Sequence, residues 1–120
     1  RLPVTLRAFG SGDGILEVAV LLEPVAHPVD AFTLTLALDP RFNLSNCLIG
    51  DLDPGWYEFG CHMPETGIVR LGAYTDGQAG NSIPAGTSGV LAILIIDGPV
   101  DAVIAENSIP LRLLALGDDL

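Results

Sequence analysis

The sequence contains no lysine, and its five arginines stand against fifteen carboxylates, which gives a formal net charge of −10. Phosphate backbones and anionic membrane surfaces repel a protein of this charge, so we expect no nucleic-acid partner. No apolar run approaches the roughly 20 residues that span a bilayer, and no basic segment followed by an apolar one opens the chain. We therefore expect no membrane insertion; a processed secreted protein would show the same pattern.

Groups that carry catalysis are equally scarce. The two histidines, His27 and His62, stand in turn-like settings, and no G-x-S-x-G, H-E-x-x-H or C-x-x-C pattern occurs. Asp51 and Asp53 are a close pair of carboxylates in sequence, but they precede a Pro-Gly turn, where acidic residues usually form turns. The sequence therefore predicts a protein that is not an enzyme.

Acidic, glycine-rich loops supply the oxygen ligands that calcium prefers, and the stretch at residues 50–55 is one of them. Its spacing does not fit an EF-hand, because the glycine follows Asp53 too early and His62 occupies the place of the bidentate glutamate. We expect no resident cofactor, and a structural calcium is the weaker alternative.

Cysteine occurs twice, as Cys47 and Cys61. The pair permits one intrachain disulfide that closes a loop of about 15 residues and contributes on the order of 3 kcal/mol to stability. Such bridges persist in extracellular domains, and two buried free thiols are the alternative. The pair is therefore a disulfide candidate.

The residues that are abundant point to strands. Apolar residues make up 49% of the 120 residues, and nine prolines and fourteen glycines are spread between β-branched runs. In residues 31–38, AFTLTLAL, large apolar residues alternate with Thr and Ala, as expected for a strand with one buried face. Eight or so such segments, without an amphipathic helix pattern, predict a single all-β domain of two packed antiparallel sheets, a sandwich or jelly roll.

Five stretches, taken in order, resemble cohesin domains, the receptor modules of cellulosome scaffolding proteins and of related bacterial and archaeal surface proteins. The stretches are AFTLTLALDPRFNL, GDLDPGW, GIVRLGAYTD, IPAGTSGVLAILII and IPLRLLALGDDL, and together they cover nearly the whole chain. The resemblance implies one jelly-roll domain of nine strands over residues 1–120, extracellular or at the cell surface. It also implies binding of a dockerin-type protein module, whose two calcium loops belong to that partner.

In cohesins the binding face is one sheet, and the corresponding strands here are residues 31–38, 56–62, 67–75 and 89–96. Arg70 and Tyr74 would be the energetic anchors, because both residue types are enriched among hot spots. Leu91, Ile93 and Ile95 are apolar on the side away from the inferred core, as at a protein interface, unless their strand is central or covered by residues 75–89. The outward, partner-binding residues would be Ala31, Thr33, Thr35, Ala37, Arg70, Gly72, Tyr74, Leu91, Ile93 and Ile95.

The sequence departs from the family in two respects. Cohesins commonly carry polar or charged residues on the strand that matches 31–38, where this chain has threonine and alanine, so the type of dockerin does not carry over. The family also has a final strand that would begin about where this sequence stops. Either that strand is missing, or the edge at residues 3–8 is open and pairs with a second copy in a homodimer.

A carbohydrate-binding module on the same architecture is the alternative function. It would use Trp56, Tyr57 and Tyr74 as stacking platforms. A sugar platform needs two or three coplanar exposed aromatic rings, and the chain has only four phenylalanines, two tyrosines and one tryptophan. The composition therefore favours the protein-binding module.

Overall fold

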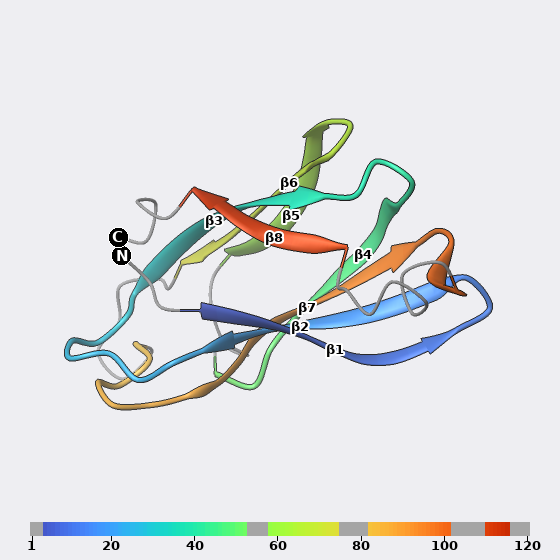
Figure 1. Cartoon of the computed structure of the whole chain (residues 1–120). Coiled ribbons are helices and arrows are strands. Elements are labelled where there is room, and N and C mark those ends of the chain that lie inside the picture. The colour runs from blue at the N-terminus through green and yellow to red at the C-terminus, as the bar shows by residue number, and fades with distance from the viewer. Residues whose placement is uncertain (1–3, 53–57, 75–81, 102–109, 116–120) are drawn as a thin grey trace.

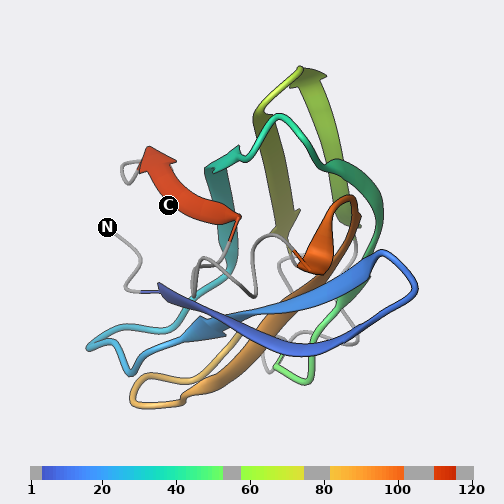
Figure 2. The same cartoon turned by 45° about the vertical axis from the view of Figure 1, so that its right-hand side comes forward.

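The chain folds as two antiparallel β-sheets packed face to face, as Figures 1 and 2 show. This computed structural model describes residues 4–52, 58–74, 82–101 and 110–115. Within these residues every regular element is a strand, apart from helical geometry at Val100 and Asp101. The all-β sandwich predicted from the sequence is confirmed.

The first sheet contains four strands in the order β1-β2-β7-β4, all antiparallel to their neighbours. Asp13 and Gly14 connect its first two strands, with φ of 53° and 78°. Two successive residues with positive φ match the twist of a hairpin, so an aspartate followed by a glycine is suited to this turn. The strands are β1 (Val4–Gly12), β2 (Ile15–Leu22), β4 (Asn43–Ile49) and β7 (Gly89–Asp97).

The second sheet also contains four antiparallel strands, in the order β5-β6-β3-β8. Its β5-β6 hairpin turns at Thr66 and Gly67, where Gly67 has a φ of 87°. Pro64 falls inside β5, which is allowed because β5 is the outermost strand of this sheet in the described chain. The strands are β3 (Ala31–Leu38), β5 (Glu58–Glu65), β6 (Ile68–Tyr74) and β8 (Leu111–Ala115).

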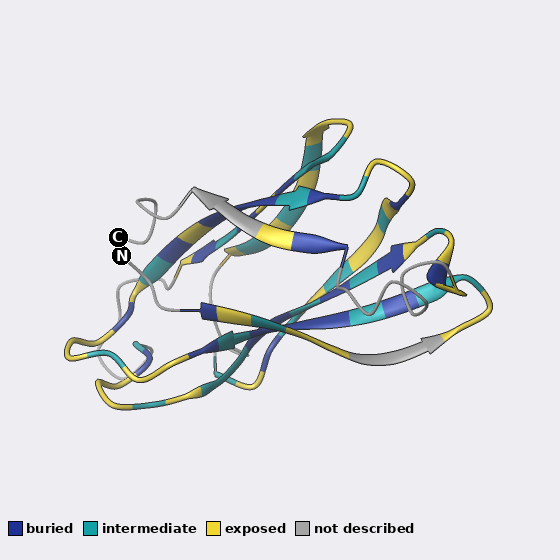
Figure 3. Cartoon of the chain, viewed as in Figure 1, coloured by how far each residue is buried: buried dark blue, intermediate teal, exposed yellow. Residues whose placement is uncertain are grey.

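The core lies between the sheets and is formed by every second residue of the inner strands. Figure 3 shows the resulting alternation of buried and exposed segments. On β3, Phe32, Leu34, Leu36 and Leu38 are each at most 2% exposed, as the alternation predicts. The matching positions of the first sheet include Val18, Val20, Leu94 and Ile96, all with 0% exposure.

The predicted position of β7 requires a correction. The strand does not lie beside β3; it is central in the first sheet, between β2 and β4. Leu91 does not face outward and is fully buried. Val20 pairs with Ala92 and Leu21 with Val90, so Leu91 is the extra residue of a bulge, and a bulge interrupts the alternation of faces. A central strand was the alternative that the sequence left open.

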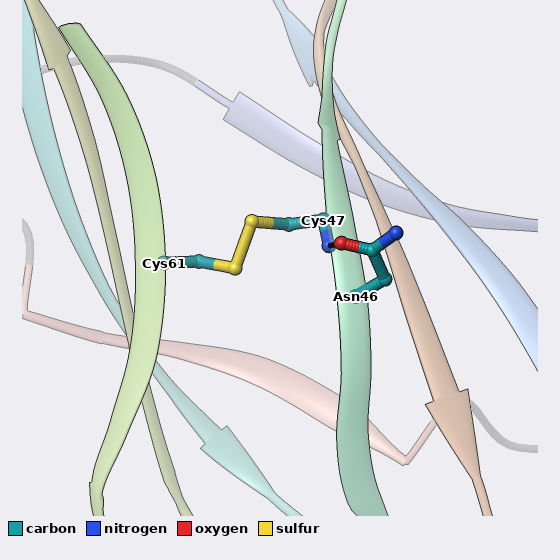
Figure 4. Close-up of a disulfide and its surroundings, with 3 residues drawn as sticks. All are labelled: Asn46, Cys47 and Cys61. Atoms are coloured by element: carbon teal, nitrogen blue, oxygen red, sulfur yellow. Dashed lines mark hydrogen bonds between the residues drawn. A yellow bond between two sulfur atoms is a disulfide. The ribbon is translucent and has the colours of Figure 1, made fainter.

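Cys47 and Cys61 are joined by a disulfide that connects β4 of the first sheet with β5 of the second (Figure 4). The Cys47 N–H also donates to the side-chain oxygen of Asn46 at 2.8 Å. Close by, the Leu44 N–H donates to the sulfur of Met63 at 3.4 Å, so the same two strands meet at a second point. Together these contacts tie the two sheets together along one side of the sandwich.

The connection between β3 and β4 is a tight turn organised by Asp39. Its carbonyl accepts from the Phe42 N–H at 2.9 Å, and its carboxylate accepts from the Arg41 N–H at 2.9 Å and from the Arg41 guanidinium at 2.6 to 3.2 Å. Hydrogen bonds from Arg41 therefore lower the pKa of Asp39 below its ordinary value. Phe42 is completely buried, so the turn anchors the chain in the core as it crosses between sheets.

Candidate functional site

The candidate site is the outer face of the β5-β6-β3-β8 sheet. Four predicted residues on β3 and three on β6 lie on it, because Leu34, Leu36 and Leu71 occupy the alternate, inward positions. Thr33, Arg70 and Tyr74 are exposed, whereas Ala31, Ala37 and Gly72 are partly buried and Thr35 is buried. The predicted face residues brought together here are Ala31, Thr33, Thr35, Ala37, Arg70, Gly72 and Tyr74.

The strand register arranges this face in three rows that run across β5, β6 and β3. The first row carries an acid and an aromatic ring, the second has almost no side chain, and the third carries an imidazole and a guanidinium. In order, the rows are Glu58, Tyr74 and Ala31; Gly60, Gly72 and Thr33; and His62, Arg70 and Thr35.

A shallow hollow of about 470 Å³ lies over these rows. Gly60 and Gly72, paired in the register, form its floor. A Cβ built on Gly60 would meet no heavy atom within 4 Å, and one on Gly72 would lie 3.2 Å from the Phe32 carbonyl oxygen. The hollow exists because these two positions lack side chains.

Thr35 differs from the other residues of the face. It is 8% exposed, and its hydroxyl oxygen is buried without a hydrogen-bond partner among the described residues. Arg70 is directly opposite on β6 and exposed to solvent. An unmet buried hydroxyl costs stability, and it leaves Arg70 as the polar group of this pair that a partner can reach.

The face holds no cluster of metal-ligating side chains in the part of the chain that is described. No group of three or more His, Cys, Asp or Glu side chains comes together there. Glu58 and His62 stand in different rows, with the glycine row between them. What this face offers is an open surface for contact with another molecule.

The sequence interpretation placed residues 56–62 in the binding sheet but named none of the outward residues of β5. Glu58, Gly60 and His62 are all exposed on its outer side. The signal was present, since Phe59, Cys61 and Met63 alternate with them and pack against the core. Trp56 and Tyr57, the other aromatic candidates, lie outside the described residues.

Ile93 and Ile95 do not join this face, because β7 belongs to the other sheet. Ile93 pairs with Ala19 of β2 and with Leu48 of β4, and Leu48 is 44% exposed. Ile93, Leu21 and Val90 line a separate hollow of about 440 Å³. The predicted apolar stripe is thus on the opposite side of the sandwich from Arg70 and Tyr74.

No protein-family model matches the chain, and no curated protein is similar to it in sequence. Among the described residues, no helix is long and apolar enough to cross a membrane. Solved structures that resemble the chain are cohesin domains.

The sixth cohesin of scaffoldin B from Acetivibrio cellulolyticus, solved in complex with a dockerin, has 18% identity and a TM-score of 0.71 over 98% of this chain and 86% of its own. The seventh type I cohesin of ScaB from Pseudobacteroides cellulosolvens has 17% identity and a TM-score of 0.72, and the match covers 97% of this chain and 75% of that cohesin chain. A cohesin from a type I cohesin–dockerin complex of Clostridium thermocellum has 15% identity and a TM-score of 0.72, and the match covers 98% of this chain and 87% of that cohesin chain. The fold of this chain is therefore the cohesin fold.

Proposed function

We propose that the chain is a non-catalytic protein-binding module that binds a dockerin through the outer face of the β5-β6-β3-β8 sheet. The observation that carries the proposal is the shape of this face, where a hollow lies over Gly60 and Gly72 between two rows of larger side chains. Exposed Arg70 and Tyr74 stand on either side of the glycine row, and both residue types supply much of the energy at protein interfaces.

The similar structures support this choice of partner. Two of the three cohesins described above were solved in complex with dockerins. The resemblance assigns the binding face of cohesins to the strands that correspond here to β3, β5 and β6. In this chain β8, and not β7, completes that sheet. Calcium is then expected on the dockerin and not on this module.

The disulfide supports an extracellular or cell-surface location. Cytosolic reductants keep most thiols reduced, whereas disulfides persist in secreted domains. The Cys47–Cys61 bridge spans two sheets of a small sandwich, which is a structural and not a catalytic position.

Carbohydrate binding is less well supported. Tyr74 is the only aromatic residue that the structure places exposed on the outer face within the described chain, and a sugar platform needs two or three such rings. Retention of the protein on cellulose or xylan, without binding to any dockerin, would favour this alternative.

Isothermal titration calorimetry with a panel of recombinant dockerins, in calcium and in EDTA, tests the proposed function. We expect binding at a one-to-one ratio that is lost in EDTA and weakened about tenfold by Tyr74→Ala. Leu48→Ala, an exposed apolar residue on the other sheet, is the matched control and should leave the affinity within about twofold. If no dockerin binds, or if Leu48→Ala is the variant that abolishes binding, the proposal is wrong.

A further inference from the structure

We infer that the glycine row accepts one large apolar side chain of the partner, and that Arg70 pairs with a carboxylate about one helical turn away on the same partner. This inference rests on the proposed function and deepens it, because it states the chemistry that the partner must present. It assigns specificity to Gly60, Gly72 and Arg70, which stand in two adjacent rows of the face.

The apolar half of the inference follows from the floor of the hollow. Gly60 and Gly72 leave the space above the strands open, and Ala31 and Tyr74, which face outward beside it, add carbon atoms to its lining. Leu71 and Ala73 turn their side chains to the core and contribute only backbone. An inserted side chain would cover backbone and carbon atoms there, and burying apolar area is the main favourable term in association. A large apolar side chain fits this space better than a charged one, which would lose its hydration on entry.

The carboxylate half of the inference follows from charge. The whole chain has a net charge of −10, yet Arg70 and His62 stand directly opposite each other at one side of the hollow. Arg70 is exposed and forms no ion pair with a described residue. The guanidinium can bind a carboxylate through two parallel hydrogen bonds.

The spacing between the rows accommodates a helical partner segment. Adjacent rows are two residues apart along each strand, which is about 6.8 Å at a rise of about 3.4 Å per residue. Side chains at positions i and i+4 of a helix have Cβ atoms about 5 to 6 Å apart. A helix with Leu or Phe at one position and Asp or Glu one turn away presents the two groups within about 1 to 2 Å of the row spacing, a difference that flexible side chains can span.

Two variants of this chain test the inference against any dockerin that the wild type binds. Gly60→Leu fills the hollow without backbone strain, since φ of Gly60 is not positive and its Cβ meets no neighbour. Arg70→Glu reverses the charge. We expect each to weaken binding about tenfold or more, with the Arg70→Glu loss recovered when the facing acid of the dockerin is changed to lysine.

Matched controls come from the other sheet. Gly12→Leu places the same side chain at another exposed glycine with no neighbour within 4 Å, and Arg7→Glu reverses an exposed arginine of β1. Both should leave the affinity within about twofold. If the wild type binds a dockerin but Gly60→Leu and Arg70→Glu bind as tightly as their controls, the inference is wrong while the proposed function stands.

A second measurement addresses the surface when no dockerin binds. In an NMR titration of the whole chain with a helical peptide that carries Leu and, four residues later, Glu, we expect amide shifts centred on Gly60, Gly72 and Arg70. A peptide with Lys in place of Glu should cause shifts at least about fivefold smaller at equal concentration. Equal shifts with both peptides, shifts elsewhere, or no shifts would overturn the inference.

Discussion

Cys47 and Cys61 connect the outermost strands of opposite sheets, with their Cα atoms 6.4 Å apart. Because Cys61 points inward, its neighbours Gly60 and His62 must point outward, since side chains alternate along a strand. Met63, the next inward residue, contacts β4 through the Leu44 N–H. The bridge therefore does more than join the sheets: it fixes which residues of β5 contribute to the candidate binding face.

Replacing both cysteines should lower stability and loosen this edge of the face. We expect Cys47→Ser combined with Cys61→Ser to reduce the free energy of unfolding by about 3 kcal/mol, as for a closed loop of this length. Urea denaturation with and without dithiothreitol checks this, because reductant should bring the wild type to the midpoint of the variant. Unfolding midpoints that stay equal in oxidised protein, reduced protein and variant would contradict a stabilising bridge.

The sequence predicted the inner strands better than their neighbours. Period-two alternation identified β3, and its four large apolar residues are in the core. The same rule failed for Leu91, because a bulge inserts one residue and reverses the alternation beyond it. A strand that is apolar on both faces, such as β7, is expected at the centre of a sheet. The pattern does not tell which of the two sheets contains it, because a central position in either sheet would bury the strand.

The candidate face was predicted in part, for a related reason. β3 and β6 pair in simple register, so their outward residues could be read from the pattern. On β5 the alternation holds through Met63, but the strand contains Pro64 and its register shifts between His62 and Glu65. The place of β8 beside β3 depends on long-range pairing, which no local pattern reports.

Thr35→Val should stabilise the protein. A buried hydroxyl without a partner loses its hydrogen bonds to water on folding, and an apolar side chain of similar shape avoids that loss. We expect the free energy of unfolding to rise by about 1 kcal/mol in chemical denaturation. Thr33→Val, at an exposed position of the same strand, is the control and should change it by less than about 0.5 kcal/mol. A loss of stability in Thr35→Val would show that the hydroxyl is bonded in solution.

The Asp39–Arg41 pair should make a small contribution to stability that depends on pH. Hydrogen bonds from Arg41 lower the pKa of Asp39 in the folded state. The contribution to stability is therefore present above the unfolded pKa of 3.8, and it is lost as the pH falls through the folded pKa. Both side chains are partly exposed, so at most about 1 kcal/mol is expected.

Asp39→Asn, which keeps an acceptor for the turn but removes the charge, isolates this contribution. The difference from wild type in the free energy of unfolding should be largest near pH 7 in low salt and should shrink below about pH 4 and in high salt. A difference that is constant between pH 7 and pH 3 would mean that the turn, and not the charge, carries the effect.

Gly50 should be among the positions least tolerant of substitution. It follows β4 where the bulged backbone of β7 passes closest, and its N–H donates to the Leu91 carbonyl at 2.8 Å. A Cβ at this position would lie 2.1 Å from the Val90 carbonyl oxygen, a contact that backbone atoms cannot relieve without moving the strand. We expect Gly50→Ala to lower the free energy of unfolding, measured by urea denaturation, by at least about 2 to 3 kcal/mol.

Gly60→Ala, where the added methyl group meets open space, is the control. It should be neutral or slightly stabilising in the same urea experiment, because alanine restricts the unfolded chain. Equal stability of the two variants would mean that β7 passes farther from Gly50, and the bulge that turns Leu91 inward would then be in doubt.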